Sequence, residues 1–268
     1  MIIETTNKHD SGKSNLWPCI YHGNGVSKNE PMFEKIKKIE SRINYQEESP
    51  KKYGITIFTW SVPEETTLLE ECFERMGIRD SLVVIPIEVK PFNWLDKIKK
   101  MNEYMPYVNT PYVMALDATD VIVSTDVRGS LWPNLIEVFE GMNCNMLWNA
   151  EKNSWPSNTD MLNLKEQLGH IENFERKLYL DHFSSGYCHG NSGGFIGKTD
   201  YVKGFYERLW KTTEPYYDRG TNEMLFGGDQ GFVRIAHLEE FPSMRYDYEC
   251  RIFQTFNKIQ EGEINIYE

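Results

Sequence analysis

Residues 111–123 read PYVMALDATDVIV, an apolar run interrupted at Asp117 and again at Asp120. An apolar run without charges before Asp117 is typical of a strand buried on both faces of a parallel sheet. Because an unpaired carboxylate is costly in such surroundings, packing alone does not explain two acids three residues apart. A hard divalent cation would offset that cost, since carboxylate oxygens are its usual ligands. Taken alone, the stretch is equally compatible with Asp117 capping a turn and Asp120 facing solvent.

Strand-like and helix-like patterns alternate on either side of this stretch. Strand-like segments lie at 17–21, 53–60, 82–87, 111–116, 145–148, 193–196 and 246–254, and helix-like segments at 31–43, 63–76, 94–105, 135–141, 160–179, 201–210 and 229–237. This alternation predicts an α/β fold with a mainly parallel, Rossmann-like sheet and helices on both faces. We expect a flexible N-terminus over 1–16 and a single domain over 17–268.

Composition narrows the classes of function. The 268 residues are 40% hydrophobic, and the net charge of -11 argues against a general polyanion binder, which would carry a basic face. The five cysteines lack C-x-x-C spacing, which favours reduced thiols over a disulfide framework. No apolar run approaches the roughly 18 residues of a membrane span, and the N-terminus does not begin like a signal peptide. We therefore expect a soluble, cytoplasmic protein, including the cytoplasm of a viral or bacterial host, with no membrane partner.

Other polar motifs also follow expected strands, where open α/β sheets bind ligands. Residues 190–197 (GNSGGFIG) place small residues where the backbone must approach something closely, but without the spacing of a P-loop or a dinucleotide fingerprint. In residues 227–232 (GGDQGF), Asp229 and Gln230 precede an apolar helix, and an ordinary N-cap is an equal explanation. Residues 22–25 (HGNG) alone indicate only a turn.

Together these motifs resemble the glycosyltransferase domain of procollagen-lysyl hydroxylases and related viral and bacterial enzymes. The resemblance covers residues 53–257 and 19–28. It is carried by PYVMALDATDVIV, NAEKNSWP (149–156), GNSGGFIG, GGDQGF, CRIFQTFN (250–257) and HGNGVSK (22–28). The resemblance implies a GT-A-like fold, Mn²⁺ as the metal and a UDP-sugar as the donor.

The order of the motifs departs from that family. There, the HGNG motif follows the strand that contains IFQ, whereas here residues 17–52 precede the first β-α unit. We therefore hypothesise a circular permutation in which 17–52 hold the displaced C-terminal motif and a linker, since domain termini often lie close together. The hypothesis predicts that His22 lies within about 8 Å of Asp117 or Asp120, because the ligands of one ion crowd around it.

The resemblance also implies roles for individual residues. The metal ligands would be His22, Asp117 and Asp120, a set that suits Mn²⁺. Asp229 is the first choice for the base that activates the acceptor hydroxyl, Glu151 is the second, and Gln230 lies beside them. The residues expected to contact the donor are Gly23, Asn24, Gly25, Lys28, Thr59, Trp60, Lys97, Asp117, Thr119 and Asn191.

Some of these donor contacts carry specific expectations. Gly23–Gly25 would bring backbone N–H groups to the diphosphate, with Lys28 as a point charge on it. Thr59 and Trp60 would bracket the uracil or its ribose. Trp60 would also compensate for Thr119, which stands where the family usually has an aromatic residue. Lys97 could reach a phosphate, although a solvated helix face is an alternative for it.

Three classes of function fit the sequence. The first is a metal-dependent glycosyltransferase that moves glucose, galactose or a related sugar from a UDP-sugar to a hydroxyl. The second is a metal-dependent nucleotidyltransferase or UDP-sugar hydrolase, and the third is a non-catalytic relative that binds sugar nucleotides. The acceptor hydroxyl could belong to a protein, a glycan, a small molecule or a modified nucleic acid, and homo-oligomerisation stays open.

Aromatic residues that would line an acceptor cleft, or else pack in the core, are Trp155, Tyr187, Tyr216 and Tyr217.

Overall fold

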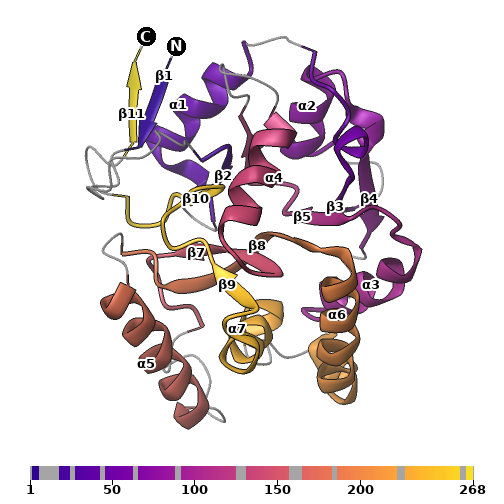
Figure 1. Ribbon diagram of the computed structural model, residues 1–268, viewed down its shortest axis with the longest axis vertical. Helices are drawn as coiled ribbons and strands as arrows, with labels where there is room; N and C mark the ends of the chain where they lie inside the picture. The colour runs from indigo at the N-terminus through magenta and orange to yellow at the C-terminus, as the bar shows by residue number, and fades with distance from the viewer. Residues whose placement is uncertain are drawn as a thin grey trace.

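The structure is a computed structural model that describes residues 2–5, 18–24, 28–42, 46–62, 66–87, 92–124, 131–156, 165–182, 186–221, 227–259 and 264–267. Strands and helices alternate along much of this length (Figure 1). The strands are β1 (Ile2–Thr5), β2 (Ile20–His22), β3 (Ile55–Ser61), β4 (Leu82–Pro86), β5 (Tyr112–Leu116), β6 (Val121–Val123), β7 (Met146–Glu151), β8 (His189–Lys198), β9 (Met244–Tyr246), β10 (Phe253–Thr255) and β11 (Ile264–Tyr267). The helices are α1 (Pro31–Glu40), α2 (Leu68–Arg75), α3 (Asp96–Tyr104), α4 (Leu131–Gly141), α5 (Lys165–His182), α6 (Thr199–Thr213) and α7 (Gly228–Glu240).

A six-stranded sheet in the order β4-β3-β5-β8-β7-β9 forms the centre of the fold. Every neighbouring pair is parallel except the two pairs that involve β8. The prediction of a mainly parallel α/β sheet is therefore confirmed. Because β8 runs against β5 and β7, its first half lies at the same edge as their carboxyl ends, with Gly194 opposite Leu116 and His189 opposite Glu151.

Helices cover both faces of this sheet, as the alternation predicts. On one face, Ile98 of α3, Phe205 of α6 and Phe232 of α7 join a large apolar cluster with the sheet. On the other face, Phe73 of α2 and Trp132 of α4 join a second cluster. Since full burial of such a side chain contributes about 1.5–3 kcal/mol, each cluster anchors its helices firmly to the strands.

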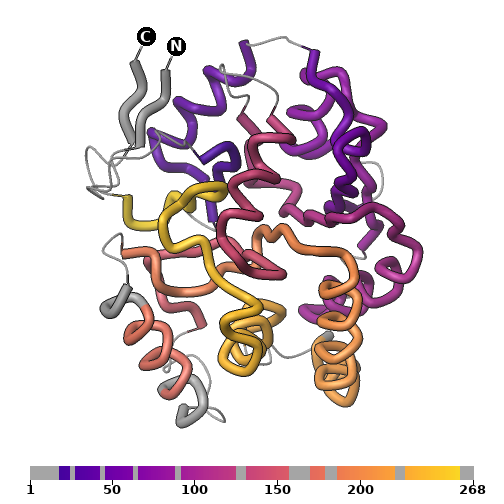
Figure 2. The backbone as a smooth tube through the Cα atoms, in the orientation of Figure 1, coloured from indigo at the N-terminus to yellow at the C-terminus, as the bar shows by residue number. Residues whose placement is uncertain are grey.

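A second sheet of three short strands carries the N-terminal motif to the edge where β5 and β7 end. Its order is β10-β2-β6, with β2 parallel to β10 and antiparallel to β6. Figure 2 shows the yellow C-terminal part of the chain beside the indigo β2 segment. The register sets His22 opposite Val121 and Thr255, which are distant in sequence from it and from each other.

The two ends of the chain lie side by side (Figure 1). Strands β1 and β11 form an antiparallel pair, with Ile2 opposite Tyr267 and Thr5 opposite Ile264. Within the segment 1–16, for which we expect flexibility, a partner strand satisfies the backbone of Ile2–Thr5. The flexibility of the segment stays a prediction. The remainder of that segment lies outside the described residues.

The start of α2 also differs from the expectation. The helix begins at Leu68, where Thr67 and Glu70 form a capping box, rather than at Pro63. The Thr67 backbone N–H donates to a Glu70 carboxylate oxygen over 3.0 Å, and the Glu70 N–H donates to the Thr67 hydroxyl over 3.3 Å. Such reciprocal bonds satisfy two N–H groups that a helix start leaves unpaired. Residues 63–65 lie outside the described part of the chain.

The expected single strand over 246–254 is two strands, β9 and β10. The buried Asp247 carboxylate lies between them and accepts the backbone N–H groups of Arg251, Ile252 and Phe253, at 2.9, 2.7 and 2.9 Å. These bonds turn the chain, so β9 joins the six-stranded sheet and β10 joins the three-stranded one. A side chain that replaces strand partners in this way is difficult to foresee from hydrophobic pattern.

Candidate metal centre and its surroundings

Three side chains able to bind a metal meet where the two sheets adjoin. His22 ends β2, while Asp117 and Asp120 follow β5. One ligand atom from each lies within 4.8 Å of the others. His22 Nε2 is 3.4 Å from Asp120 Oδ1 and 3.9 Å from Asp117 Oδ2. The prediction that His22 lies near the two aspartates is therefore confirmed.

Backbone hydrogen bonds hold these three segments together. The Gly23 N–H donates to the Asp120 carbonyl over 2.7 Å, and the Asp117 N–H donates to the Gly193 carbonyl over 2.9 Å. The pairing of β2 with β6 extends the first contact, because it sets His22 opposite the residue after Asp120. The main chain therefore places the three side chains before any ligand arrives.

The His22 imidazole lies directly against Gly193 and Asn149. A Cβ at position 193 would be 2.1 Å from His22 Cε1, far closer than real contacts allow. Asn149 Nδ2 lies 3.2 Å from His22 Nδ1, with donor and acceptor roles that depend on the tautomer. The Asn149 amide is itself held in place, because its Nδ2 donates to Asn191 Oδ1 over 3.2 Å and its Oδ1 accepts from the Thr255 hydroxyl over 3.0 Å. These two neighbours set the position of the imidazole.

Neither neighbour was singled out individually from the sequence. Gly193 lies within the GNSGGFIG string, and Asn149 begins NAEKNSWP. Two sequence features point to these positions. A glycine inside a strand often marks a place where another group approaches the backbone closely, and an amide side chain directly follows the apolar residues 146–148. Neither signal names His22 as the group approached, because that contact joins segments far apart in the chain.

The donor set fits a divalent cation. Asp120 Oδ1 is buried and has no hydrogen-bond partner among the described residues. Burial raises the pKa of Asp120, but the positive charges of His22, Lys97 and Lys28 outweigh this effect and lower it to about 2. Burial lowers the pKa of His22, yet the nearby carboxylates, Asp120 first, raise it above its usual value. An imidazole with two carboxylates, one of them left with an unpaired oxygen, suits Mn²⁺ or a related ion.

Lys97 of α3 connects this cluster to a further acid, Asp229 of α7. Its ammonium group donates a hydrogen bond to Asp117, lies 3.9 Å from Asp229 Oδ2 and stands 5.1 Å from the ring centre of Trp60. Burial opposes its charge, but Asp117 and Asp229 raise the pKa of Lys97 overall. Burial raises the pKa of Asp229, and Lys97 works against that rise. A carboxylate with a raised pKa and a 19% exposed side chain is suited to accept a proton.

Glu151, at the end of β7, is an enclosed hydrogen-bond acceptor. Its Oε1 accepts from Gln230 Nε2 at 2.7 Å and from Asn191 Nδ2 at 3.3 Å, while Oε2 accepts from Asn24 Nδ2 at 2.8 Å. All four residues were expected to contact the donor or to lie beside the base, and the structure brings them together. Glu151 is fully buried, and this burial raises its pKa. Because its carboxylate is closed off by its partners, the structure argues against Glu151 as the base and favours a positioning role.

Two of the residues expected to contact the donor, Thr59 and Trp60, are buried. Thr59 is fully buried, and its hydroxyl donates to the Leu116 carbonyl over 2.8 Å. Trp60 is only 5% exposed and belongs to the large apolar cluster. Since helices cover both faces of β3, neither of its alternating sets of side chains reaches solvent. Their contacts with a uracil or its ribose stay predictions, and Trp60 is linked to the site through Lys97, whose ammonium group lies 5.1 Å from its ring centre.

The glycine-rich segment gives a mixed result. The Gly23 N–H is already bonded to the Asp120 carbonyl, so it is not free for a diphosphate. A Cβ on Gly23 would lie 2.8 Å from Lys28 Cα, which explains the glycine by close packing. Gly25 lies outside the described residues. Lys28 and Thr119 are exposed beside the cluster, and their contacts with a donor stay predictions.

The aromatic residues considered for an acceptor cleft divide between core and site. Tyr187 is fully buried and donates to the Thr255 carbonyl over 3.2 Å, which makes it a core residue. Tyr216 and Tyr217 are partly buried against the large apolar cluster. Trp155 is nearest to the site through its backbone, because its carbonyl accepts from Gln230 Nε2 over 2.7 Å. Trp155 therefore contacts a proposed site residue.

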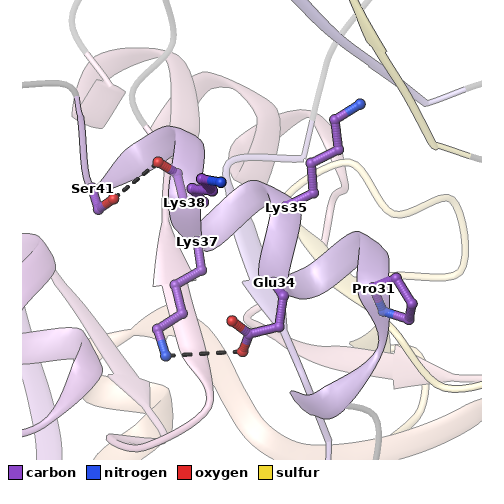
Figure 3. Close-up of a pocket in the computed structure, with 6 residues that line it drawn as sticks. All are labelled: Pro31, Glu34, Lys35, Lys37, Lys38 and Ser41. Carbon is purple, nitrogen blue, oxygen red and sulfur yellow. Dashed lines mark hydrogen bonds and ion pairs between the residues drawn. The ribbon is translucent and has the colours of Figure 1, made fainter.

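A shallow hollow of about 550 Å³ lies along α1 (Figure 3). It is lined by Pro31, Glu34, Lys35, Lys37, Lys38 and Ser41. An ion pair of 3.9 Å between Lys37 and Glu34 crosses it, and the Ser41 hydroxyl donates to the Lys38 carbonyl over 2.9 Å. Every lining residue comes from this helix or the position after it, so the hollow is a solvated helix face, and we assign it no part in the chemistry.

Comparisons with known proteins leave the site as the basis for any assignment. No protein-family description matches the sequence, and no curated protein is significantly similar to it. Among solved structures, mouse xyloside xylosyltransferase 1 in its apo form is similar over 81% of this chain and 79% of that chain, with a TM-score of 0.39 and 11% sequence identity. None of the helices described here has both the length and the apolar character that crossing a membrane requires.

Proposed function

We propose that the protein is a metal-dependent glycosyltransferase of GT-A-like fold that moves a hexose from a UDP-sugar to a hydroxyl acceptor. One observation carries the proposal: His22 of the HGNG motif meets Asp117 and Asp120, although the motif stands at the opposite end of the sequence from its place in the resembling family. The meeting of Asn24 and Gln230 on Glu151 adds support from the other motifs.

Each charged group has a place in the proposed reaction. His22, Asp117 and Asp120 would hold the metal, which when bound would neutralise charge on the leaving diphosphate. Lys97 can exchange its hydrogen bond with Asp117 for one with a phosphate oxygen, since the donor would compete for the same ammonium group. Lys28 adds a second positive charge at the exposed side of the cluster.

Asp229 would accept the proton of the acceptor hydroxyl. As the acceptor oxygen bonds to the anomeric carbon, the bond from that carbon to the phosphate oxygen breaks, and its electron pair leaves with UDP. The raised pKa of Asp229 favours proton transfer to it. Gln230 fixes the first turn of α7, and therefore Asp229, because its amide bonds both Glu151 and the Trp155 carbonyl at 2.7 Å.

The experiment is a thermal-shift screen of UDP-sugars with Mn²⁺, followed by product analysis with and without acceptors. A donor should raise the melting temperature only when the metal is present, because ligands that bind the folded state stabilise it. Asp120→Asn should abolish this stabilisation, while Asp80→Asn, at an exposed position, should preserve it. Equal stabilisation of both variants would refute the site. Free sugar or a sugar phosphate as the sole product would favour a hydrolase or nucleotidyltransferase.

A further inference from the structure

An aromatic pair precedes α3 in the turn that leads to Lys97. The rings of Phe92 and Trp94 meet edge to face, with centroids 4.9 Å apart. Phe92 is 40% exposed, although large apolar side chains are mostly buried in the described part of the chain. An exposed aromatic side chain next to polar groups is a common feature of binding sites.

This turn is fixed by a buried amide. Asn93 is 3% exposed; its Nδ2 donates to the Tyr217 carbonyl over 2.9 Å, and its Oδ1 accepts the Leu95 N–H over 2.9 Å. The Trp94 N–H donates to the Gly220 carbonyl over 3.2 Å. Gly220 must be small, since a Cβ there would lie 2.6 Å from Asn93 Oδ1. The flanking rings are therefore presented in a defined position.

The aromatic pair lies on the same side of the candidate metal ligands as Asp229. A Cβ on Gly228, the residue before Asp229, would be 3.3 Å from Trp94 Cε3. Lys97, three residues after Trp94, lies 3.9 Å from Asp229 Oδ2 on one side and bonds Asp117 on the other. Trp94 thus lies beside the start of the helix that carries the candidate base, and the Phe92 ring packs against Trp94, while the candidate metal ligand Asp117 contacts Lys97.

We propose that Phe92 and Trp94 form the apolar floor of an acceptor subsite that binds a pyranose ring, so that the acceptor is a sugar hydroxyl. This inference rests on the proposed function. A pyranose presents C–H groups on its faces and hydroxyl groups at its edge, which matches an aromatic surface beside a carboxylate. Of the four acceptor classes open from the sequence, the glycan fits this surface best, because the net charge of -11 disfavours nucleic acid.

The test measures sugar binding directly, without donor turnover. Methyl β-glucopyranoside, β-galactopyranoside and β-xylopyranoside are added to the protein loaded with UDP and diamagnetic Mg²⁺, and saturation-transfer NMR reports ring contact. We expect transfer to the ring protons of at least one glycoside. Phe92→Ala should weaken its binding about tenfold, and Phe92→Tyr should retain it. The matched control is Tyr107→Ala, which removes an 81% exposed aromatic side chain beyond the opposite end of α3 and should change nothing.

Other results would overturn the inference. These are absence of transfer in the wild type, equal binding by wild type and Phe92→Ala, or a loss of UDP affinity in Phe92→Ala, which would make the pair a nucleobase platform. Donor turnover is measured in parallel to separate the two proposals. Sugar binding that depends on Phe92 without any donor turnover would refute the proposed function alone. Turnover that is unaffected by Phe92→Ala at every glycoside concentration would refute the subsite alone.

Discussion

At the scale of single residues, the absence of a side chain at Gly193 is as important as the ligands themselves. The His22 ring occupies the space that any larger residue at 193 would need. We therefore expect Gly193→Ala to displace the imidazole and to weaken Mn²⁺ binding by about 10–100-fold, the range typical of changes beside a metal ligand. Mn²⁺ binding measured by electron paramagnetic resonance checks this expectation.

The control for that change is Gly141→Ala. Nothing lies within 4 Å of a Cβ at the end of α4, so this variant should bind Mn²⁺ like the wild type. Equal affinities for the Gly193 and Gly141 variants would mean that His22 is not a ligand, or that the ring relocates without loss. Circular dichroism on both variants separates loss of metal binding from loss of the fold.

Removal of the Lys97 charge should change the affinities for metal and for nucleotide in opposite directions. Its ammonium group competes with a metal for Asp117 and adds positive charge to the cluster. Lys97→Met should therefore tighten Mn²⁺ binding in the absence of nucleotide by about tenfold, since a unit charge about 4 Å away is worth on the order of 1–4 kcal/mol. The same change should weaken UDP binding, because it removes a phosphate partner. Titration calorimetry with each ligand measures both effects.

The matched variant is Lys100→Met, which removes a lysine on the same helix that pairs with Glu103 instead. It should leave both affinities unchanged. If Lys97→Met weakened Mn²⁺ binding, the ammonium group would be supporting the geometry of the ligands rather than competing with the metal.

How far the sequence predicts the site depends on where each contact originates. The acids after β5 are recognisable locally, because carboxylates stand out in an apolar strand. The approach of His22 was foreseeable only through the resemblance, since it depends on β2 pairing with β6. The burial of Thr59 and Trp60 could not be predicted from their motif position, because that position does not reveal that helices cover both faces of β3. Phe92 was missed because exposure is a property of the folded surface.

At the scale of elements, α5 and α7 are joined by buried polar contacts behind the site. Arg234 donates to both oxygens of Glu175, at 3.0 and 2.6 Å, and the Tyr246 hydroxyl donates to Glu175 Oε1 over 3.2 Å. Arg234 also donates to the Pro156 carbonyl over 3.1 Å. These contacts fix the segment around Pro156, and the neighbouring Trp155 carbonyl orients Gln230. The packing of α5 against α7 therefore helps to position a residue of the site. Hydrophobic periodicity predicts both helices but not this ion pair.

One group of this region makes stability depend on pH. His237 stacks on Tyr246 at 3.8 Å between ring centres, and neither ring nitrogen has a hydrogen-bond partner among the described residues. Burial lowers its pKa from 6.5 to about 4, opposed by Glu175 and assisted by Arg234 and Arg245. Because the folded-state pKa is the lower one, the neutral ring stabilises the fold fully above pH 6.5. That stability is lost as the pH falls towards 4.

We therefore expect the free energy of unfolding to fall by roughly 3 kcal/mol between pH 7 and pH 4 on account of His237. His237→Phe keeps the stacked shape without a titrating group, so its unfolding free energy should change less over the same interval. His170→Gln, at an exposed position of α5, is the control and should follow the wild type. Urea denaturation at several pH values measures the differences, and parallel curves for all three proteins would contradict the assignment.

At the scale of the whole molecule, the pairing of β1 with β11 places the two chain ends next to each other. If the two chain ends were joined, β2 would come after β10 in the sequence. These two strands already pair in parallel. The joined order is the motif order of the resembling family, in which the HGNG segment comes last. This arrangement is what the circular permutation hypothesised from the motif order requires, and the permutation itself stays a prediction.

Reversing the permutation tests this prediction. Antiparallel neighbours can be closed by a two-residue hairpin turn, so Tyr267 can be joined through Glu268 and an Asn-Gly linker to Met1. New ends between Arg42 and Gln46 would cut the connection between α1 and β3. The packing of these two elements does not need a continuous chain. The rearranged protein should melt within a few degrees of the original and bind Mn²⁺ equally well, because every pairing that places His22 beside Asp117 is retained. A chain opened instead between Gly194 and Phe195, inside the central strand β8, should fail to fold. If the first rearrangement failed as the second does, the position of the HGNG motif at the start of this sequence would have to be explained without a permutation.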